Sequence, residues 1–214
     1  MIQNKITITN VGKIIENQVI LKDINLEFNN SKIYGLIGRN GSGKTVLLKC
    51  ICGFMKVSSG EIKLNDSIIG KDITFMNNLG FIINSPGFLP DLSGLKNLLY
   101  LASIKKKVNK QSICNTMSLV GLDWRSNKKV GKYSMGMKQR LGIAQAIMEN
   151  PDILILDEPM NGLDNQGVED IRTLLFAEKE RGKLIIITSH NNEDIDFLCD
   201  EVYKMIEGNI EKIR

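Results

Sequence analysis

The sequence predicts an α/β fold, and three observations carry this prediction. Two uninterrupted apolar runs, at residues 153–156 and 184–187, are typical of strands buried on both faces of a parallel sheet. A glycine-rich stretch at residues 38–45 separates an apolar strand from a helical segment. The middle of the chain carries apolar residues at helical spacing, as at Met137, Leu141, Ala144 and Met148.

The elements are expected in the order β-rich, helical and then mixed α/β. Alternating apolar residues predict strands at 6–8 and 24–28, and residues 60–66 predict a strand that enters a polar turn. An apolar strand at 32–37 leads into the glycine-rich stretch, and a helix at 45–52 should end at Gly53. The last segment, 202–213, predicts a hairpin that turns at Glu207-Gly208-Asn209.

Composition limits the classes of protein that are possible. The chain has 214 residues and a formal net charge of +4, which is too small to indicate nucleic-acid binding. No apolar run approaches the roughly 20 residues that a spanning helix needs, and the N-terminus lacks an apolar signal core, so we expect a cytoplasmic protein. The 4 cysteines form no CxxC pair and are accompanied by 1 histidine, so we expect reduced, buried thiols and no zinc site.

The glycine-rich stretch matches the phosphate-binding pattern G-x-x-x-x-G-K-[ST]. Glycines let several backbone N–H groups point at one anion, and the helix that follows adds the partial positive charge of its N-terminus. Lys44 should reach the β- and γ-phosphates of a nucleotide, and the Thr45 hydroxyl should bind Mg²⁺. The predicted loop is Gly38-Arg39-Asn40-Gly41-Ser42-Gly43-Lys44-Thr45.

Two carboxylates follow the first buried apolar run, at Asp157 and Glu158. In proteins with such a phosphate loop, this strand lies beside the strand that precedes the loop, so Asp157 should hold Mg²⁺. Glu158 points to the other side and can act on an attacking water as general base. The alternative is a pair of solvated acids at a strand end.

Three further motifs indicate a family. The segment Tyr133-Ser134-Met135-Gly136-Met137-Lys138-Gln139-Arg140 resembles the signature motif of the ATP-binding-cassette (ABC) ATPases. The segment Asn161-Gly162-Leu163-Asp164 resembles the D-loop of that family, and Thr188-Ser189-His190 resembles its switch histidine. The order of the motifs is also that of the family, and the resemblance covers about residues 5 to 210.

The resemblance implies a single ABC ATPase domain over 1–214. A RecA-like core with an antiparallel β subdomain should occupy 1–84 and 151–214, and a helical signature subdomain should occupy 85–150. Two copies should pair head to tail, with each ATP between the phosphate loop of one copy and Ser134 and Gly136 of the other. Asp164 would support this dimer, and His190 would contact the γ-phosphate. On physical grounds alone, Ser134 could instead serve only as a helix N-cap, and a lone histidine could be structural.

The chain departs from the family pattern at two places. Position 84 is Asn where the family has Gln, so the shorter Asn84 side chain would reach Mg²⁺ only through water or not at all. No aromatic residue lies before Phe28 to stack on adenine, and Ile15 occupies the expected position. The signature carries Met135 and Met137 in place of Gly and Gln, which is similar to bacterial peptide-antibiotic resistance and immunity exporters.

These motifs bear on three possible functions. The first is the ATP-hydrolysing subunit of an ABC transporter. Such a subunit would lie on the inner face of the cell membrane, bound to a separately encoded permease, and we expect no nucleic acid as partner. The second is a soluble ABC ATPase without a transport role, as in DNA repair or on ribosomes. The repair relatives carry a long coiled coil between the phosphate loop and the signature, and residues 45–133 leave no room for one. The ribosome-acting relatives carry two cassettes in one chain, whereas this chain holds one. The third, a GTPase or small-molecule kinase, lacks support because no N-K-x-D tetrapeptide occurs.

Overall fold

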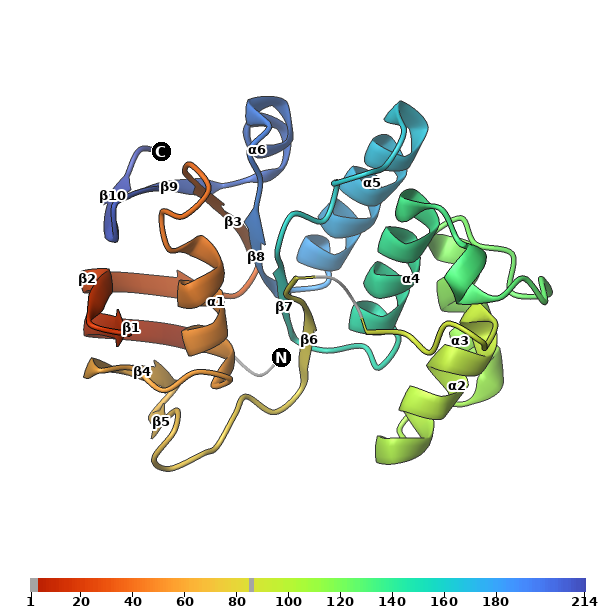
Figure 1. Ribbon diagram of the computed structural model, residues 1–214, viewed down its shortest axis with the longest axis horizontal. Helices are drawn as coiled ribbons and strands as arrows, with labels where there is room; N and C mark the ends of the chain where they lie inside the picture. Colours follow the sequence, from red (N-terminus) through yellow and green to blue (C-terminus); the bar gives the residue numbers. More distant parts are fainter. Residues whose placement is uncertain (1–3, 85–86) are drawn as a thin grey trace.

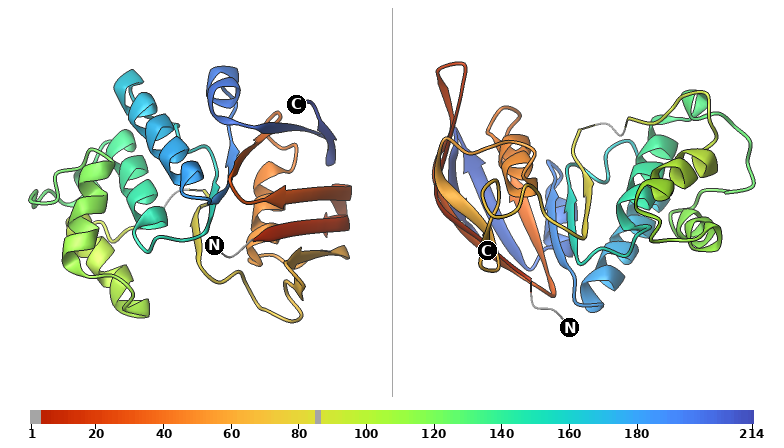
Figure 2. Two further views of the ribbon diagram at one scale, coloured as in Figure 1. Left: turned by 180° about the vertical axis from the view of Figure 1, so that it is seen from behind. Right: turned by 90° about the horizontal axis from the view of Figure 1, so that it is seen from below.

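The computed structural model describes residues 4–84 and 87–214 (Figure 1). Residues 1–3 and 85–86, which include the expected start of the helical part, lie outside the described residues. Two sheets and the helix between them form one side of the molecule, and helices gather at the other end. The two further views show the same separation (Figure 2).

The larger sheet has six strands and positions the predicted nucleotide site. Its strands from β9 to β6 run parallel, and only the edge strand β10 pairs antiparallel with its neighbour. The order is β10-β9-β3-β8-β7-β6. The expectation that the strand before the acidic pair lies directly beside the strand before the glycine-rich loop is therefore wrong, because β8 pairs with both and separates β7 from β3. The bounds are β3 Lys32–Ile37, β6 Leu79–Ile82, β7 Ile153–Leu156, β8 Leu184–Thr188, β9 Glu201–Ile206 and β10 Asn209–Lys212.

The smaller sheet is antiparallel, with the order β2-β1-β4-β5. Its strands are β1 Lys5–Ile15, β2 Gln18–Asn29, β4 Ser59–Leu64 and β5 Ser67–Ile68. The pairing of β1 with β2 shifts register several times between Ile8 and Ile14. These irregularities bend the hairpin.

The helices fall into two groups. Helix α1 (Lys44–Cys52) lies between the two sheets, and α5 (Asn165–Glu180) and α6 (Asn192–Leu198) lie on the opposite side of the larger sheet. Helices α2 (Gly94–Lys105), α3 (Lys110–Leu119) and α4 (Met135–Ile147) gather at the far end from the antiparallel sheet, with a short 3-10 turn at Val130–Lys132 before α4 (Figure 1).

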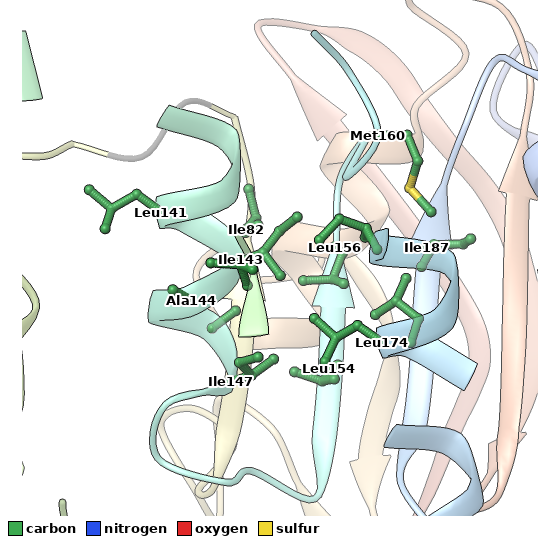
Figure 3. Packing of buried hydrophobic residues seen from close by; sticks show 14 of the residues in the cluster. Ile82, Leu141, Ile143, Ala144, Ile147, Leu154, Leu156, Met160, Leu174 and Ile187 are labelled. Atoms are coloured by element: carbon green, nitrogen blue, oxygen red, sulfur yellow. The ribbon is translucent and has the colours of Figure 1, made fainter. Parts of the chain in front are cut away.

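The alternation of buried side chains along β7 divides the core in two. Leu154 and Leu156 point to the face that Ile143 and Ile147 of α4 and Leu174 of α5 cover (Figure 3). The intervening isoleucines of β7 belong to the other cluster, with α1 and the antiparallel sheet. Burial on both faces explains the uninterrupted apolar run of this strand. The end of β7 is therefore held by packing from both sides.

The expected fold class is confirmed. The strands, the helix after the glycine-rich loop with its left-handed Gly53 cap, and the C-terminal hairpin all form where the sequence predicts them. The four cysteines are free and buried, as expected. Within residues 4–84 and 87–214, no helix is both long and apolar enough to span a bilayer.

A cluster of charged side chains joins three neighbouring strands of the larger sheet. Glu201 on β9 accepts hydrogen bonds from Lys32 Nζ at 2.6 Å, from Lys212 Nζ at 2.7 Å and from the Tyr203 hydroxyl at 2.9 Å. Partial burial by itself raises the pKa of Glu201, but the hydrogen bonds from Lys212, Lys32 and Tyr203 outweigh it and lower this pKa to about 2. The carboxylate therefore stabilises the fold above the pKa of an unfolded glutamate, and this contribution is lost as the pH falls toward 2.

Replacing Glu201 with Gln should lower the free energy of unfolding by about 1–3 kcal/mol at pH 7, because the two lysines lose their charged partner. The deficit relative to the unmodified protein should shrink at pH 3, because this glutamate is then mostly protonated in the unfolded chain while the native carboxylate, with a pKa of about 2, stays mostly ionised. Urea unfolding at both pH values measures this. Glu61→Gln, which removes an exposed ion pair with Lys63, should change the stability by less than about 1 kcal/mol. An equal deficit for Glu201→Gln at pH 7 and pH 3 would contradict the linkage.

Candidate functional site

The glycine-rich loop lies between β3 and α1 and needs its glycines for conformational reasons. Gly38, Gly41 and Gly43 all have positive φ, at 149°, 82° and 107°. A Cβ on Gly38 would lie 2.4 Å from the backbone oxygen of Met205. The Ser42 hydroxyl is buried, and the structure shows no hydrogen-bond partner for it among the described residues. A buried, unpartnered hydroxyl in such a loop suits an anionic ligand.

Lys44 begins α1 and folds back over this loop. Its side chain is almost fully buried, and Nζ donates to the carbonyl oxygens of Gly38 at 2.6 Å and Arg39 at 3.2 Å. The ammonium group is therefore held inside the curve of the loop. A phosphate bound there would exchange these two neutral acceptors for anionic oxygens, which form stronger hydrogen bonds with an ammonium.

Thr45 and Asp157 meet as the sequence predicts. The Thr45 hydroxyl donates to Asp157 Oδ2 at 2.8 Å, and the Thr188 hydroxyl donates to Asp157 Oδ1 at 2.7 Å. A hydroxyl and a carboxylate brought together in this way are oxygen ligands of the kind that Mg²⁺ prefers. In the described part of the chain, no three acidic, histidine or cysteine side chains group to hold a metal alone. Such a site suits an ion that keeps waters and shares the phosphates of a substrate.

Glu158 follows Asp157 in an unusual backbone conformation. Its φ is +52°, in the left-handed region that non-glycine residues rarely adopt. Its N–H donates to the Thr188 hydroxyl at 2.8 Å, and its Oε2 lies 2.8 Å from His190 Nδ1. The structure therefore brings Glu158 and His190 together, as the motifs predict. The same threonine contacts both acidic residues, a role that its place at the end of a buried strand could have suggested.

Asn84 lies beside this acidic pair. It follows β6, which pairs with β7, and the Asp157 N–H donates to the Ile82 carbonyl at 2.7 Å. Asn84, Asp157 and Glu158 line one common hollow. Asn84 is therefore near the acidic pair, and its contact with Mg²⁺ stays a prediction.

The signature segment forms the start of α4. Ser134 is the N-cap, and its hydroxyl accepts a hydrogen bond from the Met137 N–H at 3.2 Å. Gly136 has a neighbour that the sequence did not reveal, since a Cβ there would lie 2.7 Å from the Gly162 carbonyl oxygen. The glycine therefore permits α4 to pack against the D-loop of its own chain, in addition to any approach to a phosphate.

Asp164 caps the next helix. Its Oδ1 accepts from the Gly167 N–H at 3.0 Å and lies 3.7 Å from a guanidinium nitrogen of Arg140. The side chain stays exposed and so remains accessible to a partner.

Ile15 does not line the pocket over the phosphate loop. It ends β1, opposite Gln18, and is half-buried. The pocket over the phosphate loop is lined instead by Ile20, together with residues 40–46, Asp157 and Glu158. A contact between Ile15 and adenine stays a prediction.

The phosphate loop and the signature lie apart within one chain. Neither Ser134 nor Gly136 lines the pocket over the phosphate loop or the hollow between this loop, His190 and β9. In Figure 1, α4 and α1 stand on different sides of the larger sheet. Within one chain, Ser134 and Gly136 are therefore separate from the phosphate loop, although Met135, Lys138 and Gln139 of the same segment line the hollow beside the acidic pair.

The comparisons with known proteins agree with these motifs. A family model described as "ABC transporter" matches residues 21–161. The uncharacterized ABC transporter ATP-binding protein YybJ of Bacillus subtilis (strain 168) is 44% identical, over 96% of this chain and 94% of its own length. The bacitracin transport ATP-binding protein BcrA of Enterococcus faecalis is 39% identical, over 94% of this chain and 66% of its own. The lantibiotic transport ATP-binding protein SrtF of Streptococcus pyogenes is 33% identical, over 95% and 87%.

A solved structure shares the fold of this chain. A structure described as the dimeric structure of MJ0796, a bacterial ABC transporter cassette, matches with a TM-score of 0.85. The match covers 98% of this chain and 99% of that one at 24% identity, which supports the fold alone. With the family model and the relatives, the conclusion is that the chain belongs to the ABC transporter family, as one of its ATP-binding ATPases.

Proposed function

We propose that the chain powers an exporter as a head-to-tail dimer with two shared ATP sites, bound at the inner face of the cell membrane to a separately encoded permease. The observation that carries the proposal is the separation of the site within one chain. The phosphate loop, the acidic pair and His190 lie together, whereas Ser134 and Gly136 lie outside their pocket. A second copy would supply the missing side.

Each residue has a defined part in hydrolysis. The loop amides and Lys44 bind the phosphates of ATP, and Ser134 of the other copy holds the γ-phosphate from the opposite side with the N-terminus of its helix. Thr45 and Asp157 would hold Mg²⁺, with Asn84 near it. The metal offsets negative charge on the phosphate oxygens. Glu158 accepts a proton from the attacking water, and the bond to His190 holds its carboxylate in place.

The same proposal assigns different roles to two parts of the chain. Residues 1–84 and 151–214 form the core that binds ATP, and residues 85–150 form the helical part that presents the signature. Both belong to one ABC ATPase domain over 1–214. Because helices α2 to α4 gather at one end of the molecule, a movement of this end relative to the core can transmit closure of the dimer.

Dependence of the ATPase activity on protein concentration tests the shared site. Each active site needs two copies, so activity per molecule should rise with concentration and level off once the dimer saturates. The measurement is phosphate release at saturating ATP and Mg²⁺, from nanomolar to micromolar protein. Constant activity per molecule over the whole dilution series, with the chain monomeric by light scattering in ATP, would refute the dimer.

An apolar groove supports the permease as a partner. Leu79 and Phe81 of β6 face Leu101 and Ile104 of α2 across it, and an ion pair between Lys105 and Glu149 lies at its edge. The Ile104 side chain is 72% exposed. An exposed apolar groove of this kind fits a partner that inserts apolar side chains. The names of BcrA and SrtF, which are bacitracin and lantibiotic transport proteins, point to a peptide antibiotic as cargo.

Replacing Ile104 with Glu should release the chain from the permease and leave its own ATPase unchanged, because a charge would be buried in the groove. The measurement is the fraction of chain that sediments with membranes when it is produced with a neighbouring reading frame that encodes about six apolar segments. Leu119→Glu, on the exposed face of α3, is the matched control. If the chain never sediments with membranes, the alternative of a soluble ABC ATPase without a transport role is favoured.

A further inference from the structure

The signature helix reaches the acidic pair of its own chain through one side chain. Gln139 lies on α4, one turn after the N-cap Ser134, and its amide nitrogen donates to two backbone carbonyls. The acceptors are Glu158 O at 3.1 Å and Pro159 O at 3.0 Å. Both hydrogens of the amide are therefore used on the segment that follows β7.

The backbone that Gln139 holds is the strained one. Glu158 has a φ of +52°, and a non-glycine residue keeps such a conformation only where its surroundings enforce it. On one side, its N–H donates to Thr188 of β8 at 2.8 Å. On the other side, its carbonyl accepts from Gln139 and from the Asn161 N–H at 3.1 Å. One of these contacts comes from the sheet, one from the local turn, and one from the helical part of the chain.

The contacts around Gln139 make the start of α4 and the segment 158–164 a single unit. A Cβ on Gly136 would lie 2.7 Å from Gly162 O, and a Cβ on Gly162 would lie 2.7 Å from Met135 Cγ. Gln139 also borders the open hollow that Asn84, Asp157 and Glu158 line. Close packing therefore joins the helix to the segment after β7, and the two hydrogen bonds of Gln139 connect it to the backbone of Glu158.

We propose that Gln139 is a positioning residue, which sets the direction of the Glu158 carboxylate according to the position of α4. The inference rests on the shared site proposed above, in which the start of α4 completes the ATP site of the other copy. ATP bound at the phosphate loop of one copy would draw in the signature helix α4 of the other copy. Through Gln139, the position of that helix would orient Glu158 in the second copy's own ATP site, so the two sites of the dimer become coupled. Misplacing a reacting group by about 1 Å can cost about 100-fold in rate.

Gln139→Met keeps the length of the side chain and removes both donors. We expect kcat for ATP hydrolysis to fall about 10-fold or more, with the Kd for ATP within about 2-fold of the unmodified value, because no phosphate-loop residue changes. Gln111→Met makes the same chemical change on the exposed face of α3, where Gln111 donates to Asn115, and should retain full activity. An unchanged kcat in Gln139→Met, or a loss explained entirely by weaker ATP binding, would overturn the inference.

A second variant gives a pH signature that a purely structural role would not produce. In Gln139→Glu, a carboxylate faces two carbonyl oxygens, so it should be less active than Gln139→Met at pH 8. When protonated, its O–H can donate again, so the ratio of the two activities should rise at least about 3-fold by pH 5.5. A ratio that stays constant between these pH values would refute the hydrogen-bonding role. If the unmodified chain itself hydrolyses no ATP in the same assay, the proposed function fails instead.

Discussion

Replacing Glu158 with Gln should yield a protein that binds ATP and dimerises but hydrolyses ATP at least about 100-fold more slowly. A positioned general base contributes typically 10²–10⁴-fold to a rate, and an amide cannot accept the proton of the attacking water. The amide can still bond to His190, which lies 2.8 Å from the native carboxylate, so the site should keep its shape. Slow hydrolysis should trap the ATP-bound dimer.

The experiment measures single-turnover phosphate release together with the molecular mass in ATP. Glu211→Gln, an exposed residue on β10, is the matched control and should hydrolyse ATP at the normal rate. Full turnover in Glu158→Gln would remove Glu158 from its proposed role. A variant that hydrolyses slowly and also fails to dimerise would place Glu158 in dimer formation instead.

Replacing Lys44 with Ala should abolish most of the binding of ATP itself. The ammonium is held by Gly38 O and Arg39 O inside the phosphate loop, where a phosphate would meet it directly. Loss of charge-assisted hydrogen bonds worth about 2–4 kcal/mol corresponds to a Kd that is about 30- to 1,000-fold higher. The two variants should therefore differ, since Glu158→Gln separates binding from hydrolysis and Lys44→Ala removes binding.

Thermal unfolding with and without ATP and Mg²⁺ distinguishes lost binding from misfolding. A ligand at 100 times its Kd stabilises the folded state by about 2.7 kcal/mol, so the unmodified protein should show a clear rise in Tm. Lys44→Ala should keep a cooperative transition without this rise. Lys49→Ala, on the same helix and away from the loop, should retain the full rise. A normal ATP-dependent rise in Lys44→Ala would contradict its role as a phosphate ligand.

Most of the fold could be predicted because buried positions are occupied by apolar residues, whose spacing along the sequence differs between strands and helices. The runs at β7 and β8 are uninterrupted because both faces of these strands are covered. The phosphate loop could be located because only glycine adopts its positive φ values at no cost. The meeting of Thr45 with Asp157, and of Glu158 with His190, followed from strands that end at the same edge of the sheet.

Contacts between distant segments could not be predicted in the same way. Ile20 of β2 lines the pocket over the phosphate loop, and no pattern along the sequence marks this contact. Thr188 contacts both acidic residues because β8 lies beside β7. Gly136 is close to Gly162 because α4 packs on the D-loop of its own chain.

The sequence by itself determined the family, the fold class and the position of the glycine-rich loop. These depend on short local motifs. One is a loop that needs glycines and is followed by a lysine and a threonine, and the other is a pair of acidic residues after a buried strand. Only the tertiary structure decided that the signature lies outside the pocket of its own phosphate loop and that Gln139 holds the strained backbone of Glu158. The physical reason is that both depend on how α4 packs against the sheet, and packing joins residues whose separation along the chain carries no periodic signal.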